Sequence, residues 1–304
     1  MSSSPLPTTR RWSPGEGIQS YAFLAPALLV LVTFLLLPAF WVFGLSLFHW
    51  DLIAANPDFI GLENYRVLLT HDKTFFKALG ATVFFVAVSV PLSMALGLGL
   101  AVLLDKPILG RSLMRGAIFA PFVMPLVASV LIWSWLLNPD FGLIDAVLKM
   151  LHLPQLQFLG SAREALPSII LYSLWQQAGY NTVIFLAGLS NLPPDLEEAA
   201  KVDGANAGQR FWLVTWPLLS PTTYFVLIIN LIGAFKVWVP VVVFTGPQGG
   251  PDNAAMTLGL YLYNQAFISF RAGYAGAISV VLFLIILSIT ALQTGLLSRR
   301  VFYR

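Results

Sequence analysis

The chain contains no cysteine and three histidines among its 304 residues. The absence of cysteine excludes disulfides, thiolate metal sites and a cysteine nucleophile. His49, His71 and His152 are far apart in the sequence and fall in predicted loops, which favours solvated side chains over a metal site. No segment has the form G-x-x-x-x-G-K-[ST], which excludes an ATP site of the P-loop kind in this chain.

Charged residues are also scarce, at 10% of the sequence, whereas soluble domains have about 25%. Hydrophobic residues make up 58% of the chain, and its mean hydropathy is +0.79. This balance indicates a membrane protein with several spans rather than a soluble domain with an unusually apolar core. The net charge of +3 is small and dispersed along the chain, which argues against nucleic acid as a partner.

Six apolar runs have the roughly 20 residues that a transmembrane helix needs. Backbone N–H and C=O groups in lipid have to be bonded within the segment, so the runs are predicted to be helices. We therefore expect an all-α integral membrane fold with six transmembrane helices, over residues 21–47, 78–104, 116–137, 165–189, 217–244 and 275–297. Residues 1–20 are predicted to form a short disordered tail, followed by a transmembrane domain over 21–304.

Lysine and arginine are distributed unevenly between the two sets of segments that connect these spans. The set that includes both termini contains Arg10, Arg11, Lys106, Arg111, Arg115, Lys201, Arg210, Arg299, Arg300 and Arg304. The opposite set contains Arg66, Lys73, Lys77, Lys149, Arg163 and Arg271. Because cytoplasmic segments carry more basic residues, both termini and the segment 190–216 are predicted to be cytoplasmic. The segments 48–77, 138–164 and 245–274 are then expected to be extracytoplasmic loops.

Small residues recur in the second predicted span. They are Ala95, Gly97, Gly99 and Ala101. Small side chains let two helix backbones approach closely in a membrane. We therefore expect another helix to pack against this stretch.

The most polar stretch of the chain, Asn191–Phe211, lies between the fourth and fifth predicted spans. Pro194 suits the first turn of a helix, and acidic side chains follow it at the positive end of the helix dipole. Gly204 is expected to end this helix, because glycine readily adopts the left-handed conformation. Asn206 and Gln209 have the spacing of a capping pair, which predicts a second short helix that leads into the fifth span.

The segment "EAAKVDGANAGQRFWLVTWP" resembles the EAA motif of the permeases of ATP-binding-cassette (ABC) importers. The matching residues are Glu198, Ala199, Ala200, Gly204, Val214 and Pro217. Trp216 stands where the motif usually has leucine, which affects the end of the match alone. Three further segments are similar, in the same order, to segments of sugar and glycerol-phosphate permeases: Phe59–Leu69, Phe235–Pro251 and Tyr261–Ser279.

The resemblance implies one permease subunit of a binding-protein-dependent ABC importer of the maltose/glycerol-3-phosphate type, with the type I permease fold. It assigns ATPase coupling to the segment 190–216, here called the coupling loop, and within it to Glu197, Glu198, Ala199, Ala200, Asp203 and Gly204. The implied partners are a second homologous permease, two ATPase subunits that hold ATP and Mg, and an extracytoplasmic solute-binding protein. This chain would then be no enzyme and hold no cofactor, in a bacterial or archaeal plasma membrane. The implied solute is a sugar or oligosaccharide, with glycerol 3-phosphate or a related phosphodiester as the alternative.

Lys236 is the charged residue that lies well inside a predicted span. A charge at mid-bilayer costs at least about 2.5–3.5 kcal/mol, which favours a functional role. Snorkelling of the side chain to the outer interface is the alternative. The family resemblance implies that this part of the fifth span lines the solute pathway, and Asn230 lies nearly two turns deeper in the same span.

The fourth predicted span contains several polar and aromatic residues in an otherwise apolar run. They are Trp175, Gln176, Gln177, Tyr180 and Asn181. Gln177 and Asn181 are four residues apart and share a helical face. Aromatic and amide groups suit a polyhydroxylated solute, and we assign Gln177, Tyr180 and Asn181 to the pathway. Hydrogen bonding between helices is the alternative role for the amides.

Two other functions are weaker interpretations of this sequence. A stand-alone secondary transporter is expected to carry intramembrane acidic residues for ion coupling, and none of the fourteen Asp and Glu residues lies deep in a predicted span. A membrane-embedded enzyme needs a Ser/His/Asp, paired-carboxylate or metal constellation within the membrane. The sequence offers no such constellation, so it favours the importer permease.

Overall fold

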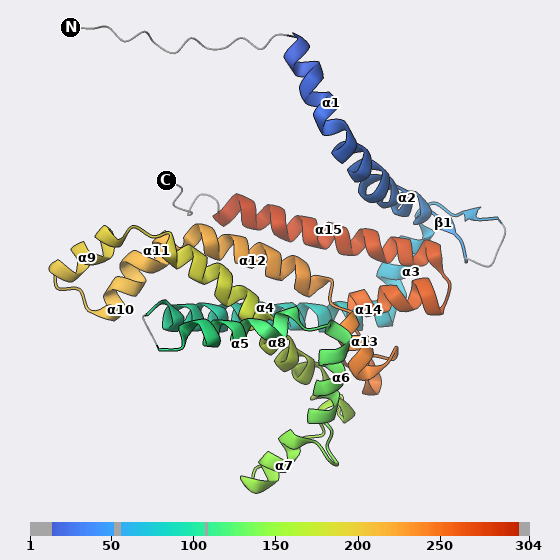
Figure 1. Cartoon of the computed structure of the whole chain (residues 1–304). Helices are drawn as coiled ribbons and strands as arrows, with labels where there is room; N and C mark the ends of the chain where they lie inside the picture. Colours follow the sequence, from blue (N-terminus) through green and yellow to red (C-terminus); the bar gives the residue numbers. More distant parts are fainter. Residues whose placement is uncertain (1–13, 52–55, 107–108, 298–304) are drawn as a thin grey trace.

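The computed structural model describes residues 14–51, 56–106 and 109–297. These residues are predominantly helical and include one two-stranded hairpin, so the predicted all-α class is confirmed. Figure 1 shows long helices lying side by side, with α1 diverging from them. The predicted tail falls mainly outside the described residues. Helix α1 begins at Pro14, so the part of the range 1–20 that is described is helical rather than disordered.

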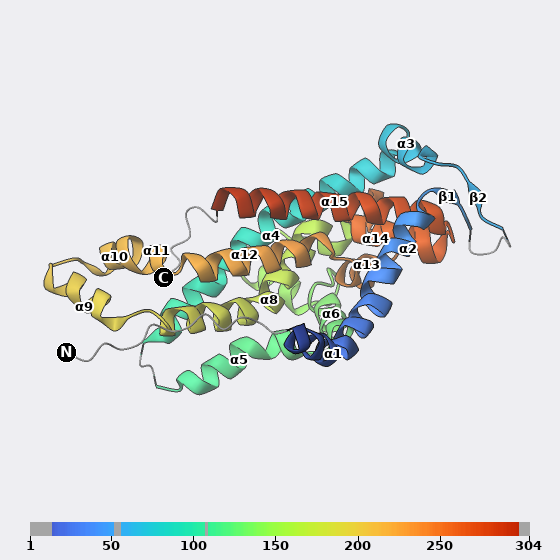
Figure 2. The ribbon, with the colours of Figure 1, turned by 90° about the horizontal axis from the view of Figure 1, so that it is seen from above.

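Four long helices form the bundle. They are α4 (Lys73–Asp105), α8 (Ala165–Ser190), α12 (Ser220–Phe235) and α15 (Ala272–Leu297). Helices α4 and α8 share the most extensive contact of the described elements, and α12 packs against α4, α8 and α15. Both Figure 1 and Figure 2 show α12 between α8 and α15. Because α12 touches every other long helix of the bundle, any movement of α12 changes three helix contacts.

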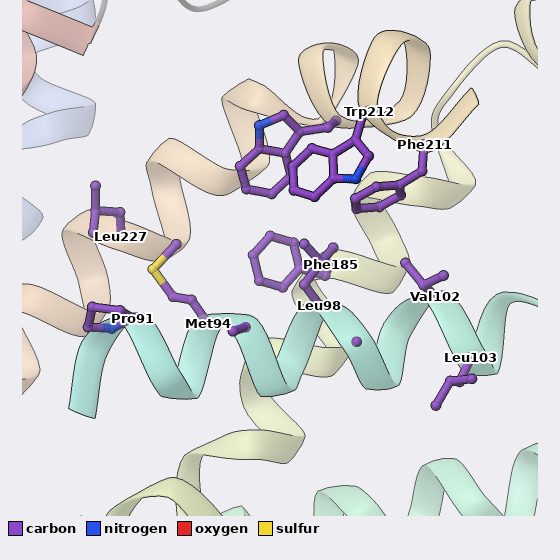
Figure 3. Close-up of a pocket in the computed structure, with 12 residues that line it drawn as sticks. Pro91, Met94, Leu98, Val102, Leu103, Phe185, Phe211, Trp212 and Leu227 are labelled. Carbon is purple, nitrogen blue, oxygen red and sulfur yellow. The ribbon is translucent and has the colours of Figure 1, made fainter. Parts of the chain in front are cut away.

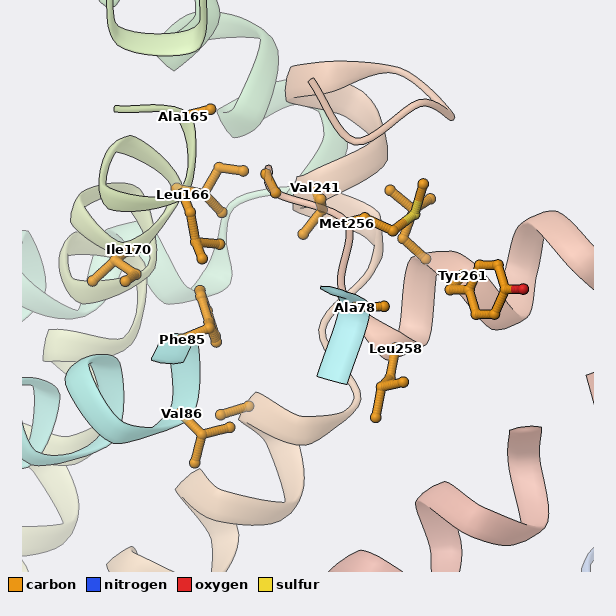
Figure 4. Packing of buried hydrophobic residues seen from close by; sticks show 14 of the residues in the cluster. Ala78, Phe85, Val86, Ala165, Leu166, Ile170, Val241, Met256, Leu258 and Tyr261 are labelled. Carbon is orange, nitrogen blue, oxygen red and sulfur yellow. The ribbon is translucent and has the colours of Figure 1, made fainter. Parts of the chain in front are cut away.

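The largest group of buried apolar residues lies where α4 and α8 meet two shorter helices, α13 (Val239–Thr245) and α14 (Leu258–Tyr263). Figure 4 shows Phe85 of α4 near Leu166 of α8, with Val241 of α13 beside them. A second, smaller group holds the opposite ends of α4, α8 and α12 together: Ala101, Leu104, Phe185, Leu186, Leu219 and Val226. Close packing of this kind is a main source of helix association in a membrane.

The first predicted span is a helix that lies apart from the bundle over most of its length (Figure 1). It consists of α1 (Pro14–Leu31), a π-helical turn (Val32–Leu36) and α2 (Leu37–Leu45). Its part from Phe23 to Leu45 is long and apolar enough to cross a membrane, and none of its most apolar window is buried. Its end packs against α15, where the rings of Phe43 and Phe283 lie 5.7 Å apart between centroids.

The predicted third span, 116–137, is not one straight helix. It contains α5 (Arg111–Val123) and α6 (Leu126–Leu136), which are bent by 99° relative to each other. The break falls at Met124, whose ψ is 144°, and at Pro125. Proline lacks an N–H donor and disfavours the helical conformation of the residue before it. Counting apolar residues found the segment but not this bend.

The predicted fifth span, 217–244, is also interrupted. A π-helical turn and a short helix precede α12, and the helical segment that contains them, Ala207–Leu218, is bent by 67° from α12. They are η3 (Phe211–Thr215) and α11 (Trp216–Leu218). At its other end α12 stops at Phe235, and α13 starts at Val239 with Pro240 in its first turn. Lys236 therefore lies in a break between two helices rather than inside a continuous span.

The six-span prediction agrees with the helices of the described residues but is not settled by them. Three helices, over 23–45, 73–105 and 272–295, are long and apolar enough to cross a membrane singly. The two bent pairs raise the number to five. Helix α8, with 26 residues and several amides in its middle, is the remaining predicted span. The count of six stays a prediction.

The three segments predicted as extracytoplasmic loops contain regular structure. Strands β1 (Phe48–His49) and β2 (Asp58–Phe59) form an antiparallel hairpin, so His49 lies in a strand and not in a loop. The other elements there are α3 (Glu63–Thr70), α7 (Leu143–Met150), η2 (Phe158–Gly160), η4 (Pro251–Asn253), α14 and η5 (Asn264–Ile268). Their turns were visible in the sequence, whereas these short elements were too brief to stand out between them.

Candidate functional site

The coupling loop forms two short helices, as predicted. Helix α9 (Pro194–Val202) has Pro193 as its N-cap, and acidic residues occupy its first turn. Gly204 follows the helix with φ of +81°, in the left-handed region that favours glycine. The N–H of Ala205 donates to the carbonyl of Ala200 at 3.0 Å, which closes the end of the helix. The expectation that Gly204 ends this helix is confirmed.

The second helix of the coupling loop, α10 (Ala207–Arg210), begins with a reciprocal cap. The N–H of Gln209 donates to the Asn206 side chain at 2.9 Å, and the N–H of Asn206 donates to the Gln209 side chain at 2.8 Å. This is the predicted capping pair. Helix α10 runs directly into η3 and α11, and this helical segment is joined to α12 through a 67° bend at Leu219.

Ion pairs connect the two helices of the loop. Glu197 lies 3.2 Å from Lys201 on its own helix and 3.8 Å from Arg210 on the next one. Arg210 also donates to the carbonyl of Ala205 at 2.7 Å. Among the predicted coupling residues, Glu198 and Asp203 are exposed and make no ion pair with any described residue. Glu197 therefore stabilises the shape of the loop, whereas Glu198 and Asp203 are exposed to solvent.

The remaining predicted coupling residues are small. Ala199 and Gly204 are exposed, and Ala200 is half-buried. Among the described residues, no atom outside its neighbours in the chain lies within 4 Å of the position where a Gly204 side chain would begin. The outer surface of α9 is thus free for a partner to approach closely.

An apolar cavity of about 760 Å³ lies between the end of the coupling loop and α4. Figure 3 shows Phe211 and Trp212 on one side of it, with Met94, Leu98 and Val102 of α4 on the other. Apart from indole N–H groups, its lining side chains offer no polar atoms, so it does not suit a polyhydroxylated solute. The sequence did not predict this cavity, because it forms only when the aromatic residues within 211–216 pack across from α4.

Two predicted pathway residues, Asn181 of α8 and Asn230 of α12, lie against each other. The Asn230 amide donates to the Asn181 side-chain oxygen at 2.9 Å, and the Asn181 amide donates back at 3.3 Å. Ser93 of α4 donates to the same Asn230 oxygen at 3.3 Å. These three residues, here called the amide cluster, are almost fully buried, at 4%, 0% and 3% exposure for Ser93, Asn181 and Asn230. Ser93 was not predicted, although it stands one turn from the small-residue stretch.

The small-residue stretch explains how α4 comes so close to α8. A Cβ atom added at Gly97 would lie 2.4 Å from the Cβ of Asn181, whereas one added at Gly99 would meet no atom of the described part of the chain within 4 Å. Close approach is therefore confirmed at Gly97. Gly99 instead lines the apolar cavity.

The other predicted pathway residues are more accessible than the amide cluster. Lys236 is exposed in the break between α12 and α13. Gln177 is half-buried, one turn from Asn181 on α8. Tyr180 is half-buried and stacks on Phe122 of α5, with ring centroids 4.8 Å apart. The structure thus brings Asn181 and Asn230 together, and it leaves Lys236 outside that contact.

A third polar group lies among α4, α14 and α15. The carboxylate of Asp72 accepts hydrogen bonds from the hydroxyls of Tyr261 and Tyr274, and it also caps α4 at the N–H of Phe75. Burial, together with the Asp72 carboxylate, raises the pKa of Tyr261 well above its usual value. Tyr261 therefore remains a hydrogen-bond donor at every physiological pH. No group of His, Asp and Glu in the described residues has a geometry able to hold a metal ion.

Comparison with known proteins identifies the family. Residues 90–303 match the family described as binding-protein-dependent transport system inner membrane component. The chain belongs to this family. It is a permease component of an ABC importer, as the EAA motif predicted, and a multi-pass protein of the inner membrane.

Curated relatives cover nearly the whole chain. The chain is 33% identical over 288 residues to the sn-glycerol-3-phosphate transport system permease protein UgpA of Agrobacterium fabrum, covering 94% of this chain and 97% of that protein. It is 34% identical over 276 residues to the trehalose/maltose transport system permease protein MalF of Thermococcus litoralis, covering 90% and 92%.

A solved structure has the same fold. It is the crystal structure of a bacterial ABC transporter involved in the import of the acidic polysaccharide alginate, and the TM-score is 0.81 at 22% identity. The match covers 94% of this chain and 96% of that one. The predicted importer permease fold is confirmed.

Proposed function

We propose that this permease forms half of the pathway for a sugar or oligosaccharide in an ATP-driven importer. It couples to an ATPase subunit through the loop 190–216. The observation that carries the proposal is the helical connection from the coupling loop, through one bend at Leu219, to α12, which ends at the Lys236 break. A rigid element of this kind can transmit displacement from one end to the other.

The outward surface of α9 supports its role as the element that docks on the ATPase. Glu198 and Asp203 are free to meet basic groups of a partner cleft, while Glu197 holds the loop together. The side chains of this surface are small at Ala199, Ala200 and Gly204, so that a partner can approach the backbone. Charge complementarity on such a surface gives register and specificity.

Lys236, Gln177 and Tyr180 are the proposed pathway residues, with Lys236 at the helix break. A break between α12 and α13 frees backbone groups, which are tolerated in a membrane where they line a cavity. We favour a neutral sugar over glycerol 3-phosphate because lysine at this place also fits the sugar-permease pattern. Relatives named for trehalose/maltose and for glycerol 3-phosphate are similarly close, so the solute has to be measured.

The proposed assembly contains a second homologous permease, two ATPase subunits with ATP and Mg, and an extracytoplasmic binding protein. Both termini and the coupling loop are proposed to be cytoplasmic, because the segments on that side carry more lysine and arginine. The bundle leaves the apolar surface of the helix from Phe23 to Leu45 uncovered, and this surface can contact lipid or the second permease. Hydrolysis is assigned to the ATPase subunits, and this chain performs no covalent chemistry.

The test is uptake by the complete complex in proteoliposomes, with ATP inside and the binding protein outside. We expect uptake of a labelled neutral sugar that needs both. Lys236→Gln should retain most of this uptake, whereas an anionic solute would lose about tenfold, because charge-assisted hydrogen bonds are stronger by roughly 1–1.5 kcal/mol. Uptake by this chain alone, driven by an ion gradient without ATP, would overturn the proposal. Unchanged uptake by Lys236→Met would remove Lys236 from the pathway.

A further inference from the structure

The amide cluster stands where three helices from distant parts of the sequence meet. Ser93, Asn181 and Asn230 come from α4, α8 and α12, and their side chains bond to one another rather than to a cavity. Asn230 also donates to the carbonyl of Val226 on its own helix at 2.8 Å. The amide groups of Asn181 and Asn230 are thus already engaged, and both side chains are closed to solvent.

This burial is a property of the single chain, so a second permease or a binding protein can only increase it. A side chain that contacts a solute has to be accessible from the pathway, and Asn181 is 0% exposed. Gln177, one turn earlier on the same helix, is half-buried and outside these bonds. Solute contact therefore fits Gln177 better than Asn181 or Asn230.

The hydrogen bonds make the contact between α8 and α12 an all-or-none arrangement. A buried amide that loses its partner bears a desolvation cost, whereas a paired one does not. Gly97 adds a steric limit, because the α4 backbone lies directly on Asn181. A shift of α12 along α8 would break the bonds between the two amides, so α12 leaves this register only when water or another polar group replaces them.

We infer that the amide cluster is a lock that holds α12 against α4 and α8 in one state of the transport cycle. Ser93, Asn181 and Asn230 are positioning residues in this inference and do not bind the solute. The position of the lock supports this role, because α12 connects the coupling loop at one end with the Lys236 break at the other. Force from the ATPase reaches the break only when α12 moves, and the lock sets how readily it moves. This inference rests on the proposed transport function.

The test compares Asn181→Ala, Asn230→Ala and the double variant in the complete complex in proteoliposomes. Each single variant removes both hydrogen bonds between the two amides and leaves the remaining amide with fewer partners, so we expect basal ATP hydrolysis without binding protein to rise at least threefold. Solute taken up per ATP should fall, with little change in the solute concentration for half-maximal uptake. The double variant should be no worse than the worse single variant, because no amide that has lost its partner across the helices then remains.

Thr182→Val is the matched control. Thr182 is buried beside Asn181, but its hydroxyl donates at 2.7 Å to Ala178 of its own helix. This variant removes a buried hydroxyl but no hydrogen bond between helices, and basal hydrolysis should remain at the wild-type value. A threefold rise in this control as well would overturn the assignment, because any loss of a buried polar group would then loosen the transporter.

A solute-binding role predicts a different pattern. The two alanine variants would then raise the solute concentration for half-maximal uptake, with additive effects and unchanged basal hydrolysis, and that result would overturn the lock.

Thermal unfolding of the purified complex gives a readout that does not depend on transport. The lock predicts a shift of the unfolding midpoint in the double variant that is smaller than the sum of the single shifts. If wild-type uptake is absent but the midpoints are non-additive, the proposed function fails while the contact between the two amides stands. Additive midpoint shifts would overturn the lock whatever the transport result.

Discussion

The coupling loop and the amide cluster are both polar regions of an apolar chain, but they are stabilised in opposite ways. The loop is exposed, and its shape comes from residues close in sequence, such as the Asn206 and Gln209 cap. The amide cluster is buried and joins residues 49 or more positions apart, as between Asn181 and Asn230. An exposed polar group that loses its partner can form a hydrogen bond with water instead. A buried group has no water to replace the lost partner.

This difference separates a docking function from a positioning function. An exposed loop can exchange internal contacts for contacts with a partner, because its side chains are already hydrated. A buried cluster can change only when whole helices move. The two regions lie at the coupling end and in the middle of the same helical connection, so the first receives a displacement and the second resists it.

The largest effect is expected at the turn of the coupling loop. Gly204→Val places a β-branched side chain at φ of +81°, which costs roughly 1–3 kcal/mol of backbone strain. Because nothing lies within 4 Å of the added Cβ, the effect comes from the backbone and not from a clash. We expect uptake and stimulated ATP hydrolysis to fall by about tenfold or more in proteoliposomes.

Gly204→Asn is the control for this variant, because asparagine tolerates the left-handed conformation. It should keep uptake within about twofold of wild type. Equal losses in the valine and asparagine variants would show that the side chain itself obstructs docking, and the strain argument would then be wrong.

The local features of the coupling loop were predictable from sequence, whereas the contacts between helices were not. Gly204, Pro194 and the Asn206 cap act within a few residues of themselves, so spacing alone indicates their roles. The pairing of Asn181 with Asn230 depends on how α8 and α12 pack, which periodicity does not specify. The sequence therefore left two roles open for these amides.

The helix breaks show the same limit. Counting apolar residues located the third and fifth spans, because a membrane requires about 20 such residues. It did not locate the breaks, since proline is tolerated in some membrane helices when neighbours satisfy the freed groups. Pro125 stands at a 99° bend, while Pro91 stands inside the unbroken helix α4. The outcome at each proline depends on the packing around it.

A smaller effect is expected from filling the contact beneath the amide cluster. Gly97→Ala puts a methyl group 2.4 Å from the Asn181 Cβ, and the nearest backbone atoms of α8 lie at 3.1 and 3.2 Å. Overpacking of this kind costs about 1–3 kcal/mol. The midpoint of thermal unfolding of the purified complex should fall by several degrees, at roughly 2–4 °C per kcal/mol.

Gly99→Ala is the matched variant on the same helix, two residues away. No atom of the described residues lies within 4 Å of its added Cβ. Alanine is also more favourable than glycine inside a helix, by about 1 kcal/mol. Its unfolding midpoint should therefore stay the same or rise slightly. A similar fall in both variants would mean that α4 is sensitive to any added methyl group, and the close contact at Gly97 would not be the cause.

The smallest effect is expected at Glu197, in contrast to its neighbour Glu198. Glu197→Gln removes the ion pairs with Lys201 and Arg210, but the Glu197 side chain is 53% exposed. Exposed pairs contribute about 0.2–1 kcal/mol, so uptake should change by less than about fivefold, and 1 M salt outside and inside the vesicles should abolish the difference from wild type.

Glu198→Lys reverses a charge that no described residue pairs, and it should impair stimulated ATP hydrolysis more than Glu197→Gln does. Measuring both variants at low and high salt separates internal support of the loop from contact with the ATPase. A larger loss for Glu197→Gln, persisting in 1 M salt, would mean that Glu197 itself meets the partner and that the division of labour inferred for the two glutamates is reversed.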